Sequence, residues 1–160
     1  MNPVTPTLVI GVDPGPTTGI AAFTLGIAVR EIAGQMLMQC DAASAWYFVC
    51  TMITQRSAPN CLVAIERYVV STRSARSTDA DAARVTREVI AEITRNAFAM
   101  KLRHVVERPA VDVKRWGTDQ RLRRIGLLEP TNGMPHARDA ARHALYAAVY
   151  DLNFPDPLSK

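Results

Sequence analysis

Two apolar stretches of the sequence end in a carboxylate, and these two acids are the first candidates for chemistry. Thr7-Leu-Val-Ile-Gly-Val-Asp13 and Cys61-Leu-Val-Ala-Ile-Glu66 both have the length and composition of a buried strand. A charge at the end of a buried strand is costly unless a partner offsets its desolvation. Each acid alone also has an ordinary structural explanation, because Asp13 begins an Asp-Pro-Gly turn and Glu66 precedes Arg67.

Two further candidates lie at the start of the last predicted helix, which we expect from His136 to about Leu152. His136 and Asp139 are three residues apart and therefore share one face of this helix. Taken alone, the pair is more simply explained by capping, because acids stabilise a first helical turn. His143 lies on the same face about 10 Å further along the helix, too far to share a metal ion, so we expect it to have a structural or supporting role.

Together the four residues indicate more than they do separately. Neighbouring strand ends and a helix start can converge at one edge of a sheet, which would gather three carboxylates and an imidazole. Such a cluster repels itself without cations, and its hard oxygen donors favour Mg²⁺ or Mn²⁺ over zinc. Two such ions about 4 Å apart activate a water and stabilise the leaving oxygen of a phosphodiester. The set therefore predicts a metal-dependent phosphodiesterase.

The elements that must hold these residues follow from the pattern of apolar residues and turns. Short turns between the first three predicted strands indicate an antiparallel meander. The expected strands are Thr7–Asp13, Thr18–Leu25, Ile27–Met38, Cys61–Glu66 and His104–Glu107, and the expected helices are Asp41–Gln55 (with Asp41 as N-cap), Ser77–Leu102, Pro109–Arg115, Thr118–Ile125 and His136–Leu152. The order βββαβαβα predicts one α/β domain over residues 1–154, a central mixed five-stranded sheet flanked by helices, and a frayed tail at 155–160.

Charge is distributed unevenly along the chain. The 160 residues contain 19 Lys and Arg against 15 Asp and Glu, a net charge of +4. The first 60 residues are slightly acidic, so the basic excess lies entirely in the remainder. Most of the basic residues are Arg, whose planar fork suits phosphate oxygens. This basic half suggests a polyanionic partner, most simply nucleic acid.

Composition excludes several classes of protein. Hydrophobic residues make up 48% and charged residues 21% of the sequence, as in globular domains. No apolar run is long enough to span a bilayer, so we expect no membrane association. The N-terminus shows no secretory signal, and three widely spaced cysteines form no zinc knuckle. We therefore expect a reducing, cytoplasmic location.

Four segments resemble, in the same order, the motifs of RuvC-type Holliday junction resolvases within the RNase H-like superfamily. They are Gly11–Ala21 (GVDPGPTTGIA), Val63–Tyr68 (VAIERY), Pro109–Lys114 (PAVDVK) and His136–Ala141 (HARDAA). GVDPG and HxxDA are the most specific, and the resemblance covers residues 7 to 152. The chain is identified as a short phage-type or bacterial member of this group.

The resemblance implies an RNase H-like fold and a homodimeric, Mg²⁺-dependent endonuclease that makes paired nicks in four-way DNA junctions. It implies Asp13, Glu66, His136 and Asp139 as ligands of two Mg²⁺ ions, which Mn²⁺ can replace. His136 falls where many members have an Asp, and either ligates the second metal, which we favour, or positions the attacking water. Lys114 of the PxxVK motif is a candidate for a contact to the phosphate or transition state.

DNA contacts are expected from the segment after Glu66 and from the basic helices. Tyr68 could stack on an unpaired base, although it could equally be a core residue. Asp119 falls where many relatives have a second Lys, so nearby Arg residues are possible substitutes. The predicted DNA-contacting residues are Tyr68, Arg73, Arg76, Arg84, Lys114, Arg115, Arg121, Arg123 and Arg124.

A homodimer is expected because a four-way junction has two-fold symmetry and paired nicks need two sites. The helix Ser77–Leu102 is the expected contact, since Ala83, Ile90 and Phe98 lie beside its apolar stripe.

Three alternatives remain open at this stage. The first is a related RNase H-like nuclease acting on other branched DNA or on RNA–DNA hybrid, and the second is a non-catalytic DNA-binding module. The third is an ATP-binding, actin-like protein, although 160 residues leave no room for the second domain that such proteins close over the nucleotide.

Overall fold

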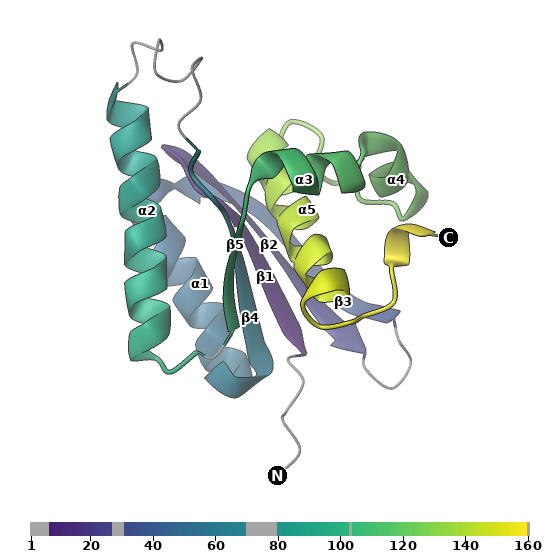
Figure 1. The fold of residues 1–160 in the computed structure, drawn as a ribbon, viewed down its shortest axis with the longest axis horizontal. Helices are drawn as coiled ribbons and strands as arrows, with labels where there is room; N and C mark the ends of the chain where they lie inside the picture. Colours follow the sequence, from purple (N-terminus) through teal and green to yellow (C-terminus); the bar gives the residue numbers. More distant parts are fainter. Residues whose placement is uncertain (1–6, 27–30, 70–79, 103, 160) are drawn as a thin grey trace.

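A mixed sheet of five strands, in the order β3-β2-β1-β4-β5, forms the centre of the molecule (Figure 1). The computed structural model describes residues 7–26, 31–69, 80–102 and 104–159. The strands β1 (Leu8–Asp13), β2 (Thr17–Gly26) and β3 (Glu31–Asp41) form the predicted antiparallel meander. The strands β4 (Cys61–Glu66) and β5 (His104–Arg108) continue the sheet parallel to β1. This arrangement confirms the predicted mixed five-stranded α/β fold.

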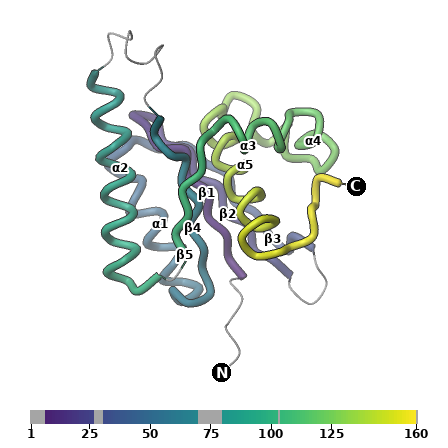
Figure 2. Tube along the Cα trace, in the orientation of Figure 1, coloured from purple at the N-terminus to yellow at the C-terminus, as the bar shows by residue number. Residues whose placement is uncertain are grey.

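Helices cover both faces of the sheet, as Figure 2 shows. On one face α1 (Ala42–Arg56) and α2 (Ala80–Ala99) pack over Ile10 and Val63. On the other, α5 (Pro135–Tyr150) packs over Val9 and Leu62, beside α3 (Ala110–Trp116) and α4 (Asp119–Arg124). Successive residues of a strand face opposite sides, so the nearly continuous apolar runs of β1 and β4 supply both cores.

Glycine brings α5 into direct contact with the sheet. A Cβ atom on Gly11 would lie 1.9 Å from the carbonyl oxygen of Ala140, and one on Gly19 would lie 2.0 Å from that of His136. The helix also presents small side chains to the sheet, among them Ala140 and Ala144. The backbone of α5 therefore rests directly on β1 and β2, which fixes the height of its first turn above the sheet.

Most predicted boundaries are close to those observed. The side chain of Asp41 accepts a hydrogen bond from the backbone N–H of Ser44 (2.9 Å), which confirms it as the N-cap of α1. Strand β3 extends further than expected, to Asp41, while residues 27–30 and the predicted start of α2 at 77–79 lie outside the described residues.

The prediction of a frayed C-terminal tail is wrong. After α5 the chain turns back and forms a short 3-10 helix, η3 (Pro157–Ser159), in which Leu158 is buried. The guanidinium of Arg121 donates to the carboxylate of Asp156 (2.5 Å) and to the carbonyl of Leu158 (3.3 Å). Burial of Leu158 and the ion pair between Arg121 and Asp156 thus hold the tail on α4. A second 3-10 turn, η1 (Ala58–Asn60), precedes β4.

No helix within the described residues is long and apolar enough to cross a membrane.

Candidate active site

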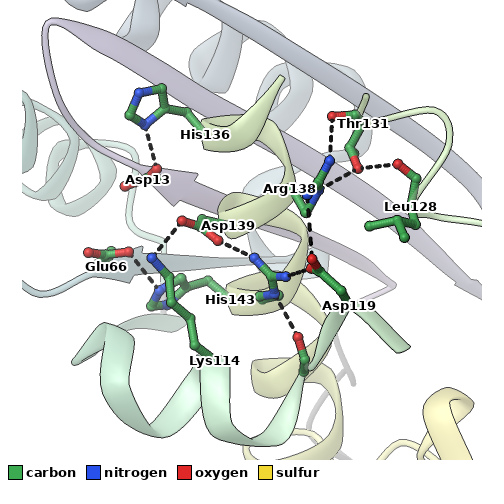
Figure 3. Close-up of polar contacts among 12 residues, drawn as sticks. Asp13, Glu66, Lys114, Asp119, Leu128, Thr131, His136, Arg138, Asp139 and His143 are labelled. Carbon is green, nitrogen blue, oxygen red and sulfur yellow. Dashed lines mark hydrogen bonds and ion pairs between the residues drawn. The ribbon is translucent and has the colours of Figure 1, made fainter. Parts of the chain in front are cut away.

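The four predicted metal-binding residues lie at one edge of the sheet. Asp13 ends β1 and Glu66 ends β4, and these two strands are parallel neighbours whose carboxyl ends lie side by side. His136 and Asp139 lie in the first turns of α5, which packs across both strands. Figure 3 shows that each of the three acids faces a basic side chain.

Asp13 is paired with His136. The imidazole Nδ1 lies 2.8 Å from Oδ2 of Asp13, whose side chain is buried. Burial and the nearby charge of Glu66 raise the pKa of Asp13 to about 6, with a smaller contribution from Asp139, while the hydrogen bond from His136 acts in the opposite direction. The charges of Glu66 and Asp139 therefore reach Asp13, and burial adds to their effect.

Asp139 is held by two cations. Lys114 of α3 places Nζ 2.7 Å from Oδ2, and the guanidinium of Arg142 donates to Oδ1. Burial of Lys114 favours its neutral form, but the contact with Asp139 and the fields of Glu66 and Asp13 outweigh burial and raise the pKa of Lys114. Lys114 is thus a fixed positive charge at the site, although its side chain remains 48% exposed.

Arg142 is a site residue that the sequence interpretation missed. It is buried, its Nε donates to the carbonyl of Gly117 (2.6 Å), and its second terminal nitrogen contacts Asp119. Asp119, expected near the site in place of a base, therefore anchors Arg142 and links the loop after α3 to Asp139. The spacing of Arg142, three residues after Asp139 in an Ala-rich helix, was the available signal.

Glu66 is paired with His143, whose Nε2 lies 3.3 Å from Oε2. The expected structural or supporting role of His143 thus has a specific contact. Gln39 was also missed: its side-chain Oε1 accepts the backbone N–H of His136 (2.9 Å). Because Met134 at the N-cap of α5 supplies no side-chain cap, strand β3 satisfies this N–H instead.

The donor types at this edge fit a hard divalent cation, since they comprise three carboxylates and an imidazole. Burial first, and then the nearby charges of Glu66 and Asp139, raise the pKa of Asp13, and a bound cation would offset both causes. However, in the described parts of the chain no three His, Cys, Asp or Glu side chains are arranged to hold a metal ion. Each acid faces its basic partner instead, so metal binding requires these side chains to turn toward a common point.

A polar hollow of about 510 Å³ opens beside Asp139. Lys114, Arg138 and Arg142 line it together with the carboxylates of Asp119 and Asp139, so three cations face two acids and leave a net positive charge. The hollow lies where α3 meets the start of α5, and its open, basic wall suits a phosphate group.

The predicted DNA contacts divide into three groups. Tyr68 is half-buried, with the guanidinium of Arg87 5.5 Å from its ring centre, and it lines a cavity of about 410 Å³ that also reaches Glu66. Arg115, Arg123 and Arg124 are exposed on α3 and α4, and exposed Arg84 pairs with Glu88 (2.7 Å). Arg73 and Arg76 lie outside the described residues.

Arg121 requires a correction. Besides holding the tail, its guanidinium donates to the carbonyl of Trp116 (2.7 Å) and lies 4.9 Å from the centre of the Trp116 ring. Each of its three nitrogens thus has a partner within the protein, so we remove Arg121 from the set of proposed DNA contacts.

Comparison with solved structures shows what the fold is similar to. One of them is "T. thermophilus RuvC in complex with Holliday junction substrate", with a TM-score of 0.59 and 16% sequence identity over 93% of this chain and 97% of that chain. At this identity the likeness shows the RNase H-like fold. No protein-family model matches the sequence, and no curated protein matches it either.

Proposed function

We propose that the protein is a metal-dependent endonuclease that resolves four-way DNA junctions by paired nicks. The observation that carries the proposal is the convergence of Asp13, Glu66 and Asp139 at one sheet edge, beside a basic hollow containing Lys114. An acidic centre beside cations is the arrangement that phosphodiester hydrolysis needs, because the acids hold metal and the cations hold phosphate. The RNase H-like fold and the four sequence motifs support the same function.

Asp13, Glu66, His136 and Asp139 are the proposed ligands of two Mg²⁺ ions, for which Mn²⁺ can substitute. When bound, the ions supply an activated water and stabilise the leaving oxygen. His136 must then turn from Asp13 toward the metal, which its partly exposed position allows. Arg142 is buried and held by three acceptors, so it keeps one oxygen of Asp139 in place.

Lys114 has a separate role in this proposal. It is the more exposed of the two cations on Asp139, and it lines the hollow. We assign it to the scissile phosphate, which it reaches by leaving Oδ2 of Asp139. Arg115, Arg123 and Arg124 extend the basic surface along α3 and α4, and we assign them to the flanking backbone. We assign Tyr68, which lines the cavity beside Glu66, to stacking on an unpaired base.

We further propose a homodimer that uses α2. Phe98 on this helix is 84% exposed, and Ala83 and Ile90 earlier on the same helix are partly buried. Aromatic residues are enriched at protein interfaces, so we assign Phe98 to the dimer contact. The free cysteines Cys40, Cys50 and Cys61 are consistent with the proposed cytoplasmic location.

One gel assay tests the function. The protein is incubated with Mg²⁺ and a four-way junction, a flap, a Y-fork, a linear duplex or an RNA–DNA hybrid of matched sequence. We expect symmetric paired nicks in the junction and little cleavage of the linear duplex. Preferential cleavage of the flap, fork or hybrid would assign a related nuclease instead, and junction binding without any cleavage would indicate a DNA-binding module.

A further inference from the structure

We propose that His143 is a positioning residue that fixes Glu66 by donating a hydrogen bond from Nε2 to its carboxylate. The inference rests on the proposed function, in which Glu66 holds a metal ion. His143 lies on α5 seven residues after His136 and four after Asp139, so all three project from one side of the helix. The helix thus reaches Asp13 through His136 and Glu66 through His143.

Burial makes this contact important for the imidazole. The side chain of His143 is 1% exposed, and its helix is otherwise rich in alanine. A polar ring in such surroundings is destabilising unless it is hydrogen-bonded. Oε2 of Glu66, 3.3 Å from Nε2, is the partner that the structure provides.

The other ring nitrogen identifies the donor. Nδ1 of His143 is buried and has no hydrogen-bond partner among the described residues. A proton on Nδ1 would therefore be buried without an acceptor, whereas a proton on Nε2 points to a carboxylate oxygen. The geometry therefore favours a proton on Nε2, which donates to Glu66.

The consequence for Glu66 is a restricted side chain. Glu has one more rotatable bond than Asp, so a glutamate at a strand end has more conformations to lose when it binds a metal ion. A hydrogen bond to one carboxylate oxygen removes part of this freedom in advance and leaves the other oxygen for ligation. Hydrogen-bonded supports of this kind commonly account for about 10- to 100-fold in metal affinity.

The test compares His143→Gln with His143→Asn, because the two amides reach different positions. The amide nitrogen of Gln can occupy the position of Nε2 and keep the bond to Glu66, whereas that of Asn reaches only to the position of Nδ1. We expect H143Q to bind Mn²⁺ with nearly the wild-type affinity in calorimetry, and H143N to bind about 10- to 100-fold more weakly. In a Glu66→Met background, which has no acceptor for this bond, the difference between H143Q and H143N should disappear.

Mn²⁺ affinity separates this role from simple packing, and urea unfolding of the same proteins measures how much each substitution destabilises the fold. If H143Q and H143N have equal Mn²⁺ affinities close to that of the wild type, His143 only fills the core and the inference is wrong.

If the wild type binds no Mn²⁺ with or without junction DNA, the proposed function fails. The contact is then judged by a double-mutant cycle of His143→Asn and Glu66→Met in urea, where additive effects would overturn it and coupling would support it.

Discussion

Nζ of Lys114 lies 2.7 Å from Oδ2 of Asp139, so a cation of α3 is held by a proposed metal ligand of α5. The sequence motifs predicted Asp139 as a metal ligand and Lys114 as a phosphate contact, and the ion pair brings the two residues together. It also implies competition, because the same carboxylate oxygen cannot fully serve both Lys114 and a metal ion.

Lys114→Met should separate metal binding from catalysis. Without the ammonium group, Asp139 keeps Arg142 but loses a competitor for its second oxygen, so Mn²⁺ should bind at least as tightly as in the wild type. Cleavage should fall by about 10²- to 10³-fold, the usual effect of removing one group that stabilises transition-state charge. Calorimetry and single-turnover cleavage measure the two effects. Wild-type cleavage by K114M would remove Lys114 from the proposed site.

Asp13 should make the metal-free protein less stable as the pH rises. Burial and Glu66 raise the pKa of Asp13 from 3.8 to about 6, so between these values the folded state binds the proton more tightly than the unfolded state. The contribution of this group to the free energy of unfolding is therefore present below pH 4 and is lost as the pH rises through 6. Asp13→Asn removes the penalty, and we expect it to stabilise the metal-free protein at pH 7 by up to about 2–3 kcal/mol.

The same substitution should abolish cleavage and leave junction binding nearly intact, because the acid is assigned to metal rather than to DNA. Urea unfolding in EDTA at pH 4 and pH 7, together with gel-shift and cleavage assays, checks both expectations. Cleavage by D13N at the wild-type rate would show that the site assignment is wrong.

Gly19→Ala should disrupt the site by displacing the first turns of α5. A Cβ there would lie 2.0 Å from the carbonyl oxygen of His136, so α5 must move away from β2 and carry His136 and Asp139 with it. Overpacking of this kind costs about 1–3 kcal/mol. The matched control is Gly34→Ala on β3, where the new Cβ would meet only the Thr24 side chain at 3.9 Å. We expect a large loss of cleavage in G19A alone, and equal activity of the two variants would contradict this.

The sequence was sufficient to predict that the acids lie at one edge of the sheet, because their positions follow from local patterns. Asp13 and Glu66 are marked by the apolar runs before them, and parallel pairing of those runs brings their ends together. His136 and Asp139 are marked by helical spacing. The fold class follows from the order of the same elements.

Contacts between distant segments could not be predicted in this way. Gln39 meets the N–H of His136 across 97 residues, and Arg142 meets Asp119 only because the loop after α3 folds back on α5. The tail was misjudged for a similar reason, since burial of Leu158 depends on Arg121 and a surface formed by α4. Nothing in the local sequence of these segments specifies its partner.

Phe98→Glu should convert the proposed dimer into a monomer. Phe98 is 84% exposed in the single chain, so the substitution leaves the fold intact but places a charge in the proposed contact. Tyr47→Glu on α1, where the side chain is 67% exposed, is the control and should remain dimeric. Sedimentation at micromolar concentration measures both. A wild type that is monomeric with and without junction DNA would exclude the dimer.

His136 offers the sharpest test of the metal site, because its imidazole replaces an acid in the resemblance to four-carboxylate sites. As a ligand it contributes one negative charge fewer than Asp, which should weaken the second Mg²⁺ and make Mn²⁺ comparatively better. His136→Asp should therefore retain substantial cleavage and shift the metal preference toward Mg²⁺. Without metal, however, H136D places a second carboxylate where Nδ1 now lies 2.8 Å from Asp13, so it should be less stable than the wild type in EDTA and regain stability with Mg²⁺.

His136→Ala removes the ligand without adding charge and should lose most cleavage while still binding junctions. The measurements are cleavage rates in Mg²⁺ and Mn²⁺ and urea unfolding with and without each ion. If H136A cleaves normally in Mg²⁺, His136 is only a residue of the first helical turn and the three acids alone hold the metal. H136D replaces the imidazole beside Asp13 by a second carboxylate, which should repel Asp13. If H136D and the wild type are equally stable in EDTA, the contact between His136 and Asp13 does not stabilise the metal-free site.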